Sequence, residues 1–476
     1  MRSFQTILAG LLAAAVIAGC KTKAPPKSAE IRQQALTNIT LPSAWKAGGA
    51  TGMIRDNWLA TFEDEQLAAL VHEAITNSPD LRIGAARVEQ AGHYVQLAKA
   101  ALKPSLGIGG TGGIKAGGGG DVSSALQGVL LAASWEADLW GRLRYGRNAA
   151  QSQHASAKAD FEFARQSLAA ATARSWFTAT ETLLARQIAT EMVQSARELV
   201  TFSEQRQRVG AGSEQEIAMA RASLGSFEDT ARQTRLAHEQ ALRALELLLG
   251  RYPAAELRAR SELSKMPGPV PVGMPLEMLE RRPDLIAAER RVAAAFNRVG
   301  EAKAAKLPRL TLNISGGAIS SDVLQLKPNF ENPTFGAGAR LVAPIYQGGA
   351  LNAQVAIRTS EQKQAVAEYG QMALRALADV ENALAASQTL SEREPILRQT
   401  LADNQRALEL TRQSYQVGRG DLRAVQQQQL STLAARTVLL RVQSEELTQR
   451  VNLHLAIGGA WEKPAAEHAS TTTKKP

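Results

Sequence analysis

Few residues of this sequence have the types and spacing that catalysis or metal binding requires. Residues 107–112 match a dinucleotide-binding glycine pattern by letter, but no parallel-strand context precedes them and no phosphate-binding helix follows. Arg419-Gly420-Asp421 spells an adhesion tripeptide, which we interpret as a coincidence. We find no pair of residues that could act as a nucleophile and its base. The histidines also lack the paired spacing of metal ligands. They are His72, His93, His154, His238, His454 and His468. The sequence therefore predicts neither an enzyme nor a bound metal or other cofactor.

Cys20 is the exception, because its surroundings predict covalent lipidation. Arg2 provides a positive start, and residues 7–17 form an apolar stretch too short to span a bilayer. The segment ends in Ile17-Ala18-Gly19-Cys20, which resembles a bacterial lipobox, where the signal is cleaved before an acylated cysteine. Several acyl chains on one residue give stable anchoring. We therefore predict a signal peptide over residues 1–19 and a lipidated, extended tether over residues 20–43.

Two further observations bear on this prediction. Cys20 is the only cysteine, which excludes a disulfide framework. The residue after Cys20 is Lys21 rather than an aspartate. By the sorting rule of enteric bacteria, a lipoprotein without that aspartate is expected in the outer membrane. The alternative is a chance cysteine at the end of an ordinary signal peptide.

The net charge and the aromatic content indicate which kinds of binding partner to expect. The formal net charge is +10 and aromatic residues make up 5% of the chain. No aromatic-basic stripe or known binding motif accompanies the charge, so we predict a basic surface and no nucleic-acid partner. The low aromatic content suits closely packed helices better than a large globular core.

The longest element that the sequence predicts is a helical hairpin from Arg142 to Leu249. Residues 142–208 contain no proline and one glycine, and a continuous helix of that length would reach roughly 100 Å. The chain then turns at Val209-Gly210-Ala211-Gly212, and Ser213 supplies an N-cap for a return helix that ends before Gly250. A seam of period seven marks the return helix: Ile217, Leu224, Ala231, His238 and Leu245.

The second half of the chain repeats the first. The turn recurs as Val417-Gly418-Arg419-Gly420, an offset of 208 residues (417 minus 209). Pro79-Asp80-Leu81 likewise recurs as Pro283-Asp284-Leu285. A tandem duplication explains both matches, whereas chance similarity between alanine-rich helices does not align prolines and glycines. We predict repeats over residues 44–250 and 280–459, a proline-rich linker over residues 251–279, and a tail over residues 460–476.

Each repeat also contains two strand-like runs, over residues 106–114 and 126–139 and over residues 310–318 and 335–346. Such runs approach the ~9–11 residues that a tilted strand needs to cross a bilayer. Four strands cannot close a barrel, and an open sheet edge in lipid leaves backbone groups unpaired. Two copies of the chain would supply eight strands and three copies twelve, and the arithmetic alone does not choose. A soluble sheet or loops beside the helices is the alternative.

The chain resembles the TolC-like outer membrane factors, in particular the lipoprotein (NodT-type) branch that serves tripartite efflux pumps. The matching residues are spread over the whole mature sequence: Cys20, Trp58, Asp64, Leu67, residues 77–81, residues 135–142, residues 281–285, residues 344–349, residues 451–453 and residues 458–461.

This resemblance implies a mixed α and β membrane protein. Three chains would form a twelve-stranded transmembrane β-barrel, continued by a long α-helical periplasmic barrel with the proline-rich linker around its middle. The two glycine turns, residues 209–212 and 417–420, would dock the hairpins of a periplasmic membrane-fusion adaptor. After the second turn the family often has a Leu-Asp-Ala-Gln run, but this chain has Val425-Gln426-Gln427-Gln428. Asp421 is therefore a candidate for the periplasmic aperture, with a helix N-cap as its alternative role.

The expected function is that of a passive exit duct in the bacterial outer membrane. It would conduct small molecules from an inner-membrane transporter and its adaptor to the exterior, with the energy supplied by the transporter. The alternatives are the outlet of a type I protein secretion system, which the lipobox disfavours, and a lipid-anchored coiled coil with no pore. The substrate is not encoded visibly, because the pump selects the cargo in such systems.

Overall fold

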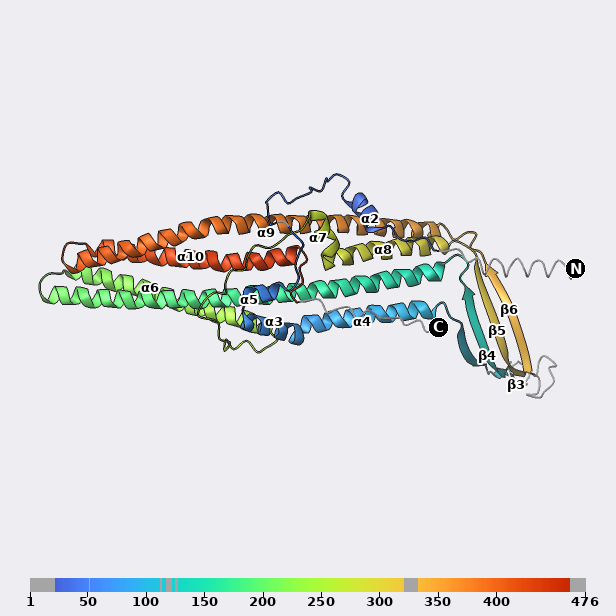
Figure 1. The fold of residues 1–476 in the computed structure, drawn as a ribbon. Helices are drawn as coiled ribbons and strands as arrows, with labels where there is room; N and C mark the ends of the chain where they lie inside the picture. Colours follow the sequence, from blue (N-terminus) through green and yellow to red (C-terminus); the bar gives the residue numbers. More distant parts are fainter. Residues whose placement is uncertain are drawn as a thin grey trace, which may run out of the picture. The chain divides into compact units, whose positions relative to one another are not determined.

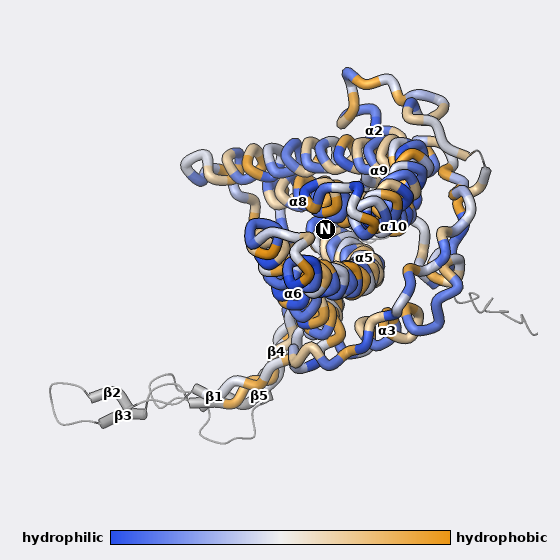
Figure 2. Tube along the Cα trace, turned by 90° about the vertical axis from the view of Figure 1, so that its left-hand side faces the viewer, coloured by the Kyte–Doolittle hydropathy of each residue, from blue (hydrophilic) through white to orange (hydrophobic). Residues whose placement is uncertain are grey.

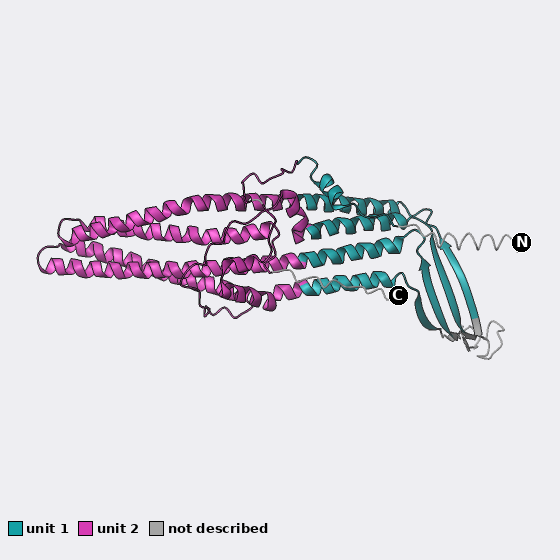
Figure 3. Cartoon of the chain, viewed as in Figure 1, with its two compact units in different colours: residues 1–39, 85–160, 286–372 teal, residues 40–84, 161–285, 373–476 magenta. Residues whose placement is uncertain are grey.

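The computed structural model of the protein describes residues 22–50, 52–111, 114–116, 122–124, 127–320 and 333–462. It divides into two compact units (Figure 3). Unit 1 takes residues 1–39, 85–160 and 286–372, and unit 2 takes residues 40–84, 161–285 and 373–476. Each unit draws on both predicted repeats, so the repeats of the sequence are not the compact units of the structure.

Helices account for most of the described chain (Figure 1), and the two halves have helices of equal length. Helices α4 (Pro79–Ala100) and α8 (Pro283–Ala304) each have 22 residues. Helices α5 (Arg142–Arg208) and α9 (Ala350–Gln416) each have 67 residues. Helices α6 (Glu214–Leu248) and α10 (Leu422–Ala456) each have 35 residues. These matching lengths support the predicted duplication.

The predicted hairpin is present as helices α5 and α6. Helix α5 has the predicted bounds, and the Ser213 side chain caps α6 by accepting from the backbone N–H of Glu216 at 3.2 Å. The seam of α6 is also confirmed, because Ile217, His238 and Leu245 are buried. Leu224 and Ala231 pack against a cluster formed by Met192, Val193, Ala196 and Phe227. Hydrophilic and hydrophobic residues also alternate along α9, the long helix of the second repeat (Figure 2).

Unit 1 contains a sheet of four antiparallel strands in the order β1-β4-β5-β6. Strand β1 is Ser105–Thr111, β4 is Gln127–Ala137, β5 is Arg309–Ser320 and β6 is Pro333–Val342. The two repeats meet where Ala133 of β4 pairs with Ile314 of β5. The four strand-like runs that the sequence predicts therefore form one sheet, with β1 and β6 at its edges, although β6 ends at Val342 rather than at the predicted residue 346.

The two faces of this sheet differ in polarity. One face carries only apolar side chains and glycine among the residues whose side chains are described: Leu106, Ile108, Val129, Leu131, Ala133, Trp135, Ala137, Leu310, Leu312, Ile314, Gly316, Phe335, Ala337, Ala339 and Leu341. Several of them are open to the surroundings, with Ile108 75%, Ile314 65% and Phe335 85% exposed. The opposite face alternates with it and holds mostly glycine, serine, threonine, asparagine and charged residues.

Three other segments also differ from the predictions. The predicted extended tether contains helix α2 (Ser28–Ala35), whose Ile31 is fully buried. The glycine-rich stretch between β1 and β4, where the sequence predicts no strand between residues 114 and 126, contains a short antiparallel pair, β2 (Ile114–Ala116) and β3 (Val122–Ser124). The last residues of the predicted linker are helical, because α7 (Pro275–Arg281) starts at a proline, which is compatible with the first turn of a helix.

The rest of the linker has no regular helix, as its prolines predict. It is fixed to unit 2 by hydrogen bonds around Asp64, the N-cap of helix α3 (Glu65–Asn77). The Asp64 carboxylate accepts from Ser264 at 2.7 Å, from the Trp176 indole at 3.1 Å and from the backbone N–H of Leu67 at 3.0 Å. Burial raises the pKa of Asp64, but these donors together with Arg260 outweigh that effect and hold it below its ordinary value. Asp64 therefore stays ionised and joins the linker to α3 and α5.

No helix within the described residues is both long and apolar enough to cross a membrane.

Candidate functional site

The predicted site residues Val209, Gly210, Ala211 and Gly212 form the turn between α5 and α6 in unit 2. Gly210 has a φ of +75°, and the backbone N–H of Ala211 donates to the carbonyl of Arg206 at 2.8 Å. A left-handed residue followed by a 6→1 hydrogen bond is the Schellman arrangement that ends many helices. Glycine suits this position because it adopts positive φ without steric cost.

The second turn, between α9 and α10, has the same construction. Gly418 has a φ of +78°, and the backbone N–H of Arg419 donates to the carbonyl of Ser414 at 2.9 Å. Both turns present a valine next to the glycine, and Val209 and Val417 are 78% and 70% exposed. The structure thus gives two matching turns with an exposed apolar residue at each.

The atoms around the four glycines of the two turns show what a side chain at each position would contact. A Cβ built on Gly210 or Gly418 would meet no atom within 4 Å, so open space lies in front of both. Gly212 and Gly420 are different, because a Cβ there would lie 3.0 Å from the backbone of Gln207 and 2.9 Å from that of Tyr415. The first glycine of each turn therefore leaves the surface accessible, and the second permits close packing of the turn.

Asp421 caps helix α10. Its carboxylate accepts from the backbone N–H of Arg423 at 3.1 Å, as Ser213 caps the matching helix α6. The side chain is exposed, whereas the neighbouring Leu422 is fully buried. This contact is the N-cap role that the sequence offered as the alternative to an aperture role.

A link between the two hairpins lies just behind the turns and was not predicted from the sequence. Arg206 of α5 donates to the carbonyl of Tyr415 in α9 and to the carbonyl of Ala211 in its own turn, each at 2.9 Å. The guanidinium also lies 4.8 Å from the centroid of the Tyr415 ring. Tyr415 is fully buried, and Phe202 packs on it edge-to-face at 5.5 Å. One arginine therefore ties both turns together.

The duplication does not reveal this link, because the two repeats carry different residues at the positions that form it. With the offset of 208, Tyr415 occupies the position of Gln207 (415 minus 208) and Ser414 that of Arg206 (414 minus 208). The two hairpins thus differ at the positions where they contact each other.

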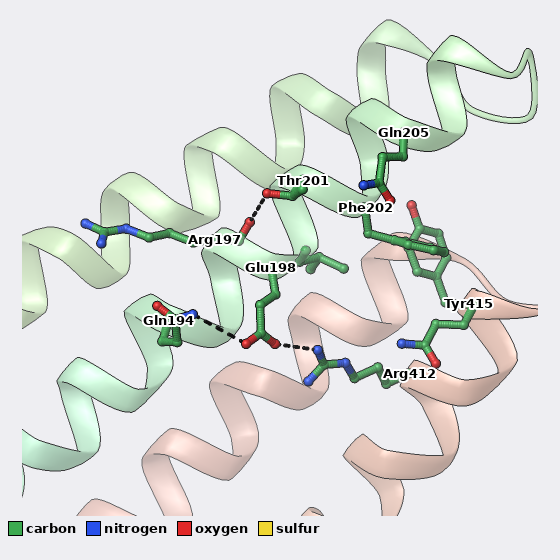
Figure 4. A pocket seen from close by; sticks show the side chains of 10 residues that line it. Gln194, Arg197, Glu198, Thr201, Phe202, Gln205, Arg412 and Tyr415 are labelled. Atoms are coloured by element: carbon green, nitrogen blue, oxygen red, sulfur yellow. Dashed lines mark hydrogen bonds and ion pairs between the residues drawn. The ribbon is translucent and has the colours of Figure 1, made fainter.

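A pocket beside this link opens between α5 and α9 (Figure 4). Phe202 and Tyr415 line one part of it, and Glu198 and Arg412 line another. Arg412 donates to Glu198 at 2.7 Å. This hydrogen bond, helped by the Arg412 charge and by Gln194, holds the pKa of Glu198 below its ordinary value against the raising effect of burial. The pocket therefore has an aromatic end and an ion pair that stays charged at neutral pH.

Cys20, the predicted lipidation site, lies outside the described residues. Within the part of the chain that the structure describes, no group of histidine, cysteine and carboxylate side chains has the arrangement of a metal site. The described part of the site is thus made of turn backbone, exposed valines and the arginine–tyrosine link.

Comparison with known proteins also divides the chain into two matching segments, one in each repeat. The family model described as "Outer membrane efflux protein" matches residues 70–251 and 274–459. "Pyoverdine export outer membrane protein OpmQ" of Pseudomonas putida is 29% identical over 463 residues, covering 93% of this chain and 95% of that protein. "Cation efflux system protein CusC" of Escherichia coli O6:H1 is 29% identical over 412 residues, covering 85% and 88%.

A solved structure shows the same fold. The Campylobacter jejuni CmeC outer membrane channel superposes with a TM-score of 0.82 at 23% identity, covering 94% of this chain and 96% of that one. The family model thus matches most of both repeats, which contain the paired turns, the repeated helices and the four-stranded sheet. The chain belongs to the outer membrane efflux protein family.

Proposed function

We propose that this protein is the outer-membrane exit duct of a tripartite efflux pump. The observation that carries the proposal is the sheet of unit 1, which has one apolar face, one polar face and, among the described residues, two edges without a partner strand. A passive duct needs such strands to sit in lipid on one side and to face water on the other. A coiled-coil rod without a pore has no use for them.

Lipid is the surrounding that suits the apolar face. Leu106, Ile108, Ile314, Phe335 and Leu341 are all exposed in the single chain, although they belong to one continuous face. In water such a face would be a liability for aggregation, because soluble proteins rarely expose large apolar patches. Trp135 lies on this face at its junction with the helices, as expected for an aromatic residue at a membrane interface.

The open edges support an assembly of several chains. They belong to β1 and β6, the outer strands of the described sheet. Closing these edges removes the cost of unpaired backbone groups in lipid. We propose three copies, whose four strands each give a barrel of twelve. The resemblance to the TolC-like factors favours three over two.

The turns at Gly210 and Gly418 are the proposed docking surface for a periplasmic adaptor. Their exposed valines offer apolar contact, and the open space in front of the glycines lets a partner backbone come close. The proposed address is the outer membrane, with the acyl chains of Cys20 as a second anchor. For Asp421 we propose the capping role, because its carboxylate already accepts from the helix backbone.

The transported substrate is left to the pump partner in this proposal. The names of the two relatives given above mention different cargoes, pyoverdine for one and cations for the other. A shared duct with different cargoes agrees with passive conduction.

Conductance of the purified protein in planar bilayers tests the proposal. We expect discrete channels together with oligomers that resist mild heating in detergent. Finding neither would favour the rod without a pore.

A second experiment tests docking at the turns. Replacing Gly210 and Gly418 with asparagine keeps a residue that tolerates positive φ but covers the open surface. We expect efflux to be lost in a strain that relies on this duct, while oligomers and conductance persist. The control is Gly225→Asn in the exposed part of α6, where a Cβ also meets nothing within 4 Å. Efflux that survived the double change would contradict the docking role.

A further inference from the structure

The polar face of the sheet in unit 1 carries two arginines that stand apart from the ion pairs around them. Arg309 begins β5 and Arg340 lies near the end of β6. Both side chains are exposed, and neither forms an ion pair or hydrogen bond with any other described residue. A guanidinium stays charged at any physiological pH. The face therefore holds two fixed positive charges.

The strand register places these two arginines next to each other. Arg309 pairs with Val342, and Thr311 pairs with Arg340. Arg309 and Arg340 are thus diagonal neighbours across one antiparallel ladder, a relation that separates Cα atoms by about 7–8 Å. Side chains of arginine length reach across that distance. Two like charges so placed repel each other unless an anion lies between them.

The carboxylates at this end of the sheet do not neutralise the pair, because they are already bound. Glu136 of β4 shares the polar face in the row of Thr311, and Arg142 donates to both of its oxygens, at 3.1 and 2.8 Å. Asp138 accepts from the Arg144 side chain at 3.1 Å and from two backbone N–H groups of α5. Among the described side chains of this face, the positive charge is left uncompensated.

From this juxtaposition we infer that Arg309 and Arg340 make an anion-selecting station inside the pore. The inference rests on the proposed function, since it needs the polar face to line a conduit. Three copies of two arginines would then place six guanidiniums around one level of the barrel. Rings of Arg or Lys select anions in pores because the low-dielectric wall concentrates their field. A carboxylate or phosphate group of a passing solute would be bound bidentately and transiently there.

Reversal potentials across a KCl gradient test the inference in planar bilayers. We expect the unmodified protein to favour Cl⁻ over K⁺. The double variant R309Q/R340Q should lower that permeability ratio by roughly tenfold while channels still open. The matched control is R87Q/R393Q, which removes two exposed arginines from helices α4 and α9.

The outcomes separate the two proposals. Absence of any conductance would contradict the proposed duct itself. Channels that open normally but keep the same ion preference in R309Q/R340Q would overturn the station alone. An equal loss of preference in the control pair would also overturn it, since selectivity would then follow the total charge.

A second measurement needs no variant and covers the case in which R309Q/R340Q does not assemble. Citrate and spermine are added separately to channels of the unmodified protein. The station predicts that the citrate anion reduces the current at a lower concentration than the spermine cation. The reverse order of potency would overturn the inference.

Discussion

His454 and Glu246 show how the two repeats use one position differently. They are equivalent by the offset of 208 residues (454 minus 246), and both are buried. The Glu246 carboxylate accepts from the backbone N–H groups of Ala255, Glu256 and Leu257 at 2.7–3.0 Å and so fixes the start of the linker. His454 stacks on Trp58 at 5.8 Å, and neither ring nitrogen has a hydrogen-bond partner among the described residues. The second repeat thus buries a titratable group that the described residues leave without a hydrogen bond.

This burial predicts an acid sensitivity. Burial, together with the nearby Arg450 charge, lowers the pKa of His454 to about 3 from an ordinary 6.5. The unfolded chain therefore binds one more proton than the folded chain between these two values. Above pH 6.5 the protonation of His454 should not lower the free energy of unfolding. Below pH 6.5 this one group should lower it by about 1.4 kcal/mol per pH unit as the pH drops towards 3.

The variant His454→Phe tests this prediction, because phenylalanine keeps the stacking on Trp58 and cannot be protonated. Denaturant unfolding at pH 7 and pH 5 should show a smaller loss of stability on acidification than in the unmodified protein. His72→Phe, at an exposed position of α3, is the control and should leave the pH dependence unchanged. An equal pH dependence in His454→Phe and the unmodified protein would show that other groups control acid unfolding.

The arginine–tyrosine link gives a second prediction at the residue scale. Arg206→Met keeps most of the aliphatic stem but leaves the carbonyls of Tyr415 and Ala211 without the charged donor. A hydrogen bond from a charged group contributes about 1.5–3 kcal/mol, so local opening at both turns should become easier. Faster hydrogen exchange in residues 206–216 and 414–424 would confirm it. Arg208→Met, at an exposed position nearby, should leave exchange at the second turn unaffected.

Among the elements, α9 contains a feature that α5 lacks. Pro395 lies inside α9, at the position that Gln187 has in α5 (395 minus 208). A proline in a helix interior removes one backbone hydrogen bond and costs about 3 kcal/mol. Both side chains are exposed, so neither position belongs to the buried core. The two long helices have the same length, and we expect α9 to be locally less stable than α5 around Pro395.

Exchanging these residues predicts opposite effects. Pro395→Ala should slow hydrogen exchange in the turns of α9 around Ser391, because the backbone bond is restored. Gln187→Pro should speed exchange in the matching part of α5 by a similar free energy. Peptides from α6 and α10 serve as internal references. Equal exchange in Pro395→Ala and the unmodified protein would mean that neighbouring contacts already compensate for the proline.

Prolines and glycines made the elements predictable from the sequence. They mark the ends of α4, α5, α8 and α9, so the bounds of α5 agree with the prediction to the residue. Helix α2 was missed because its Ser-Ala-Glu sequence lies between prolines and lysines that suggest a tether. The β2–β3 pair was missed because glycine-rich sequence gives no alternation to read.

The candidate site was predictable only in part. The turns follow from local glycine chemistry, which a single segment carries. The contact of Arg206 with Tyr415 joins residues more than 200 positions apart, so no local pattern contains it. The apolar face of the sheet depends on register between the two repeats, and that register is settled by strand pairing rather than by any one strand.

At the scale of the whole molecule, the sheet decides whether the protein is a pore or a rod. Adjacent residues Asn313 and Ile314 lie on opposite faces of β5, the first on the polar face and the second on the apolar face. In the proposed duct an arginine at Ile314 would face lipid, which costs about 2–4 kcal/mol near the middle of a bilayer. An arginine at Asn313 would face the water of the duct. The proposed duct therefore predicts that the same charge is tolerated at one position and costly at its neighbour.

Separate Ile314→Arg and Asn313→Arg variants test this difference. We expect Ile314→Arg to reduce the heat-resistant oligomer in outer-membrane fractions and Asn313→Arg to leave its amount near that of the unmodified protein. Asn313→Arg should also strengthen the preference for anions, because it adds a third arginine to the polar face. A rod that never enters the membrane makes the opposite prediction for Ile314→Arg, since a charge on an exposed apolar face would improve its solubility and preserve its assembly.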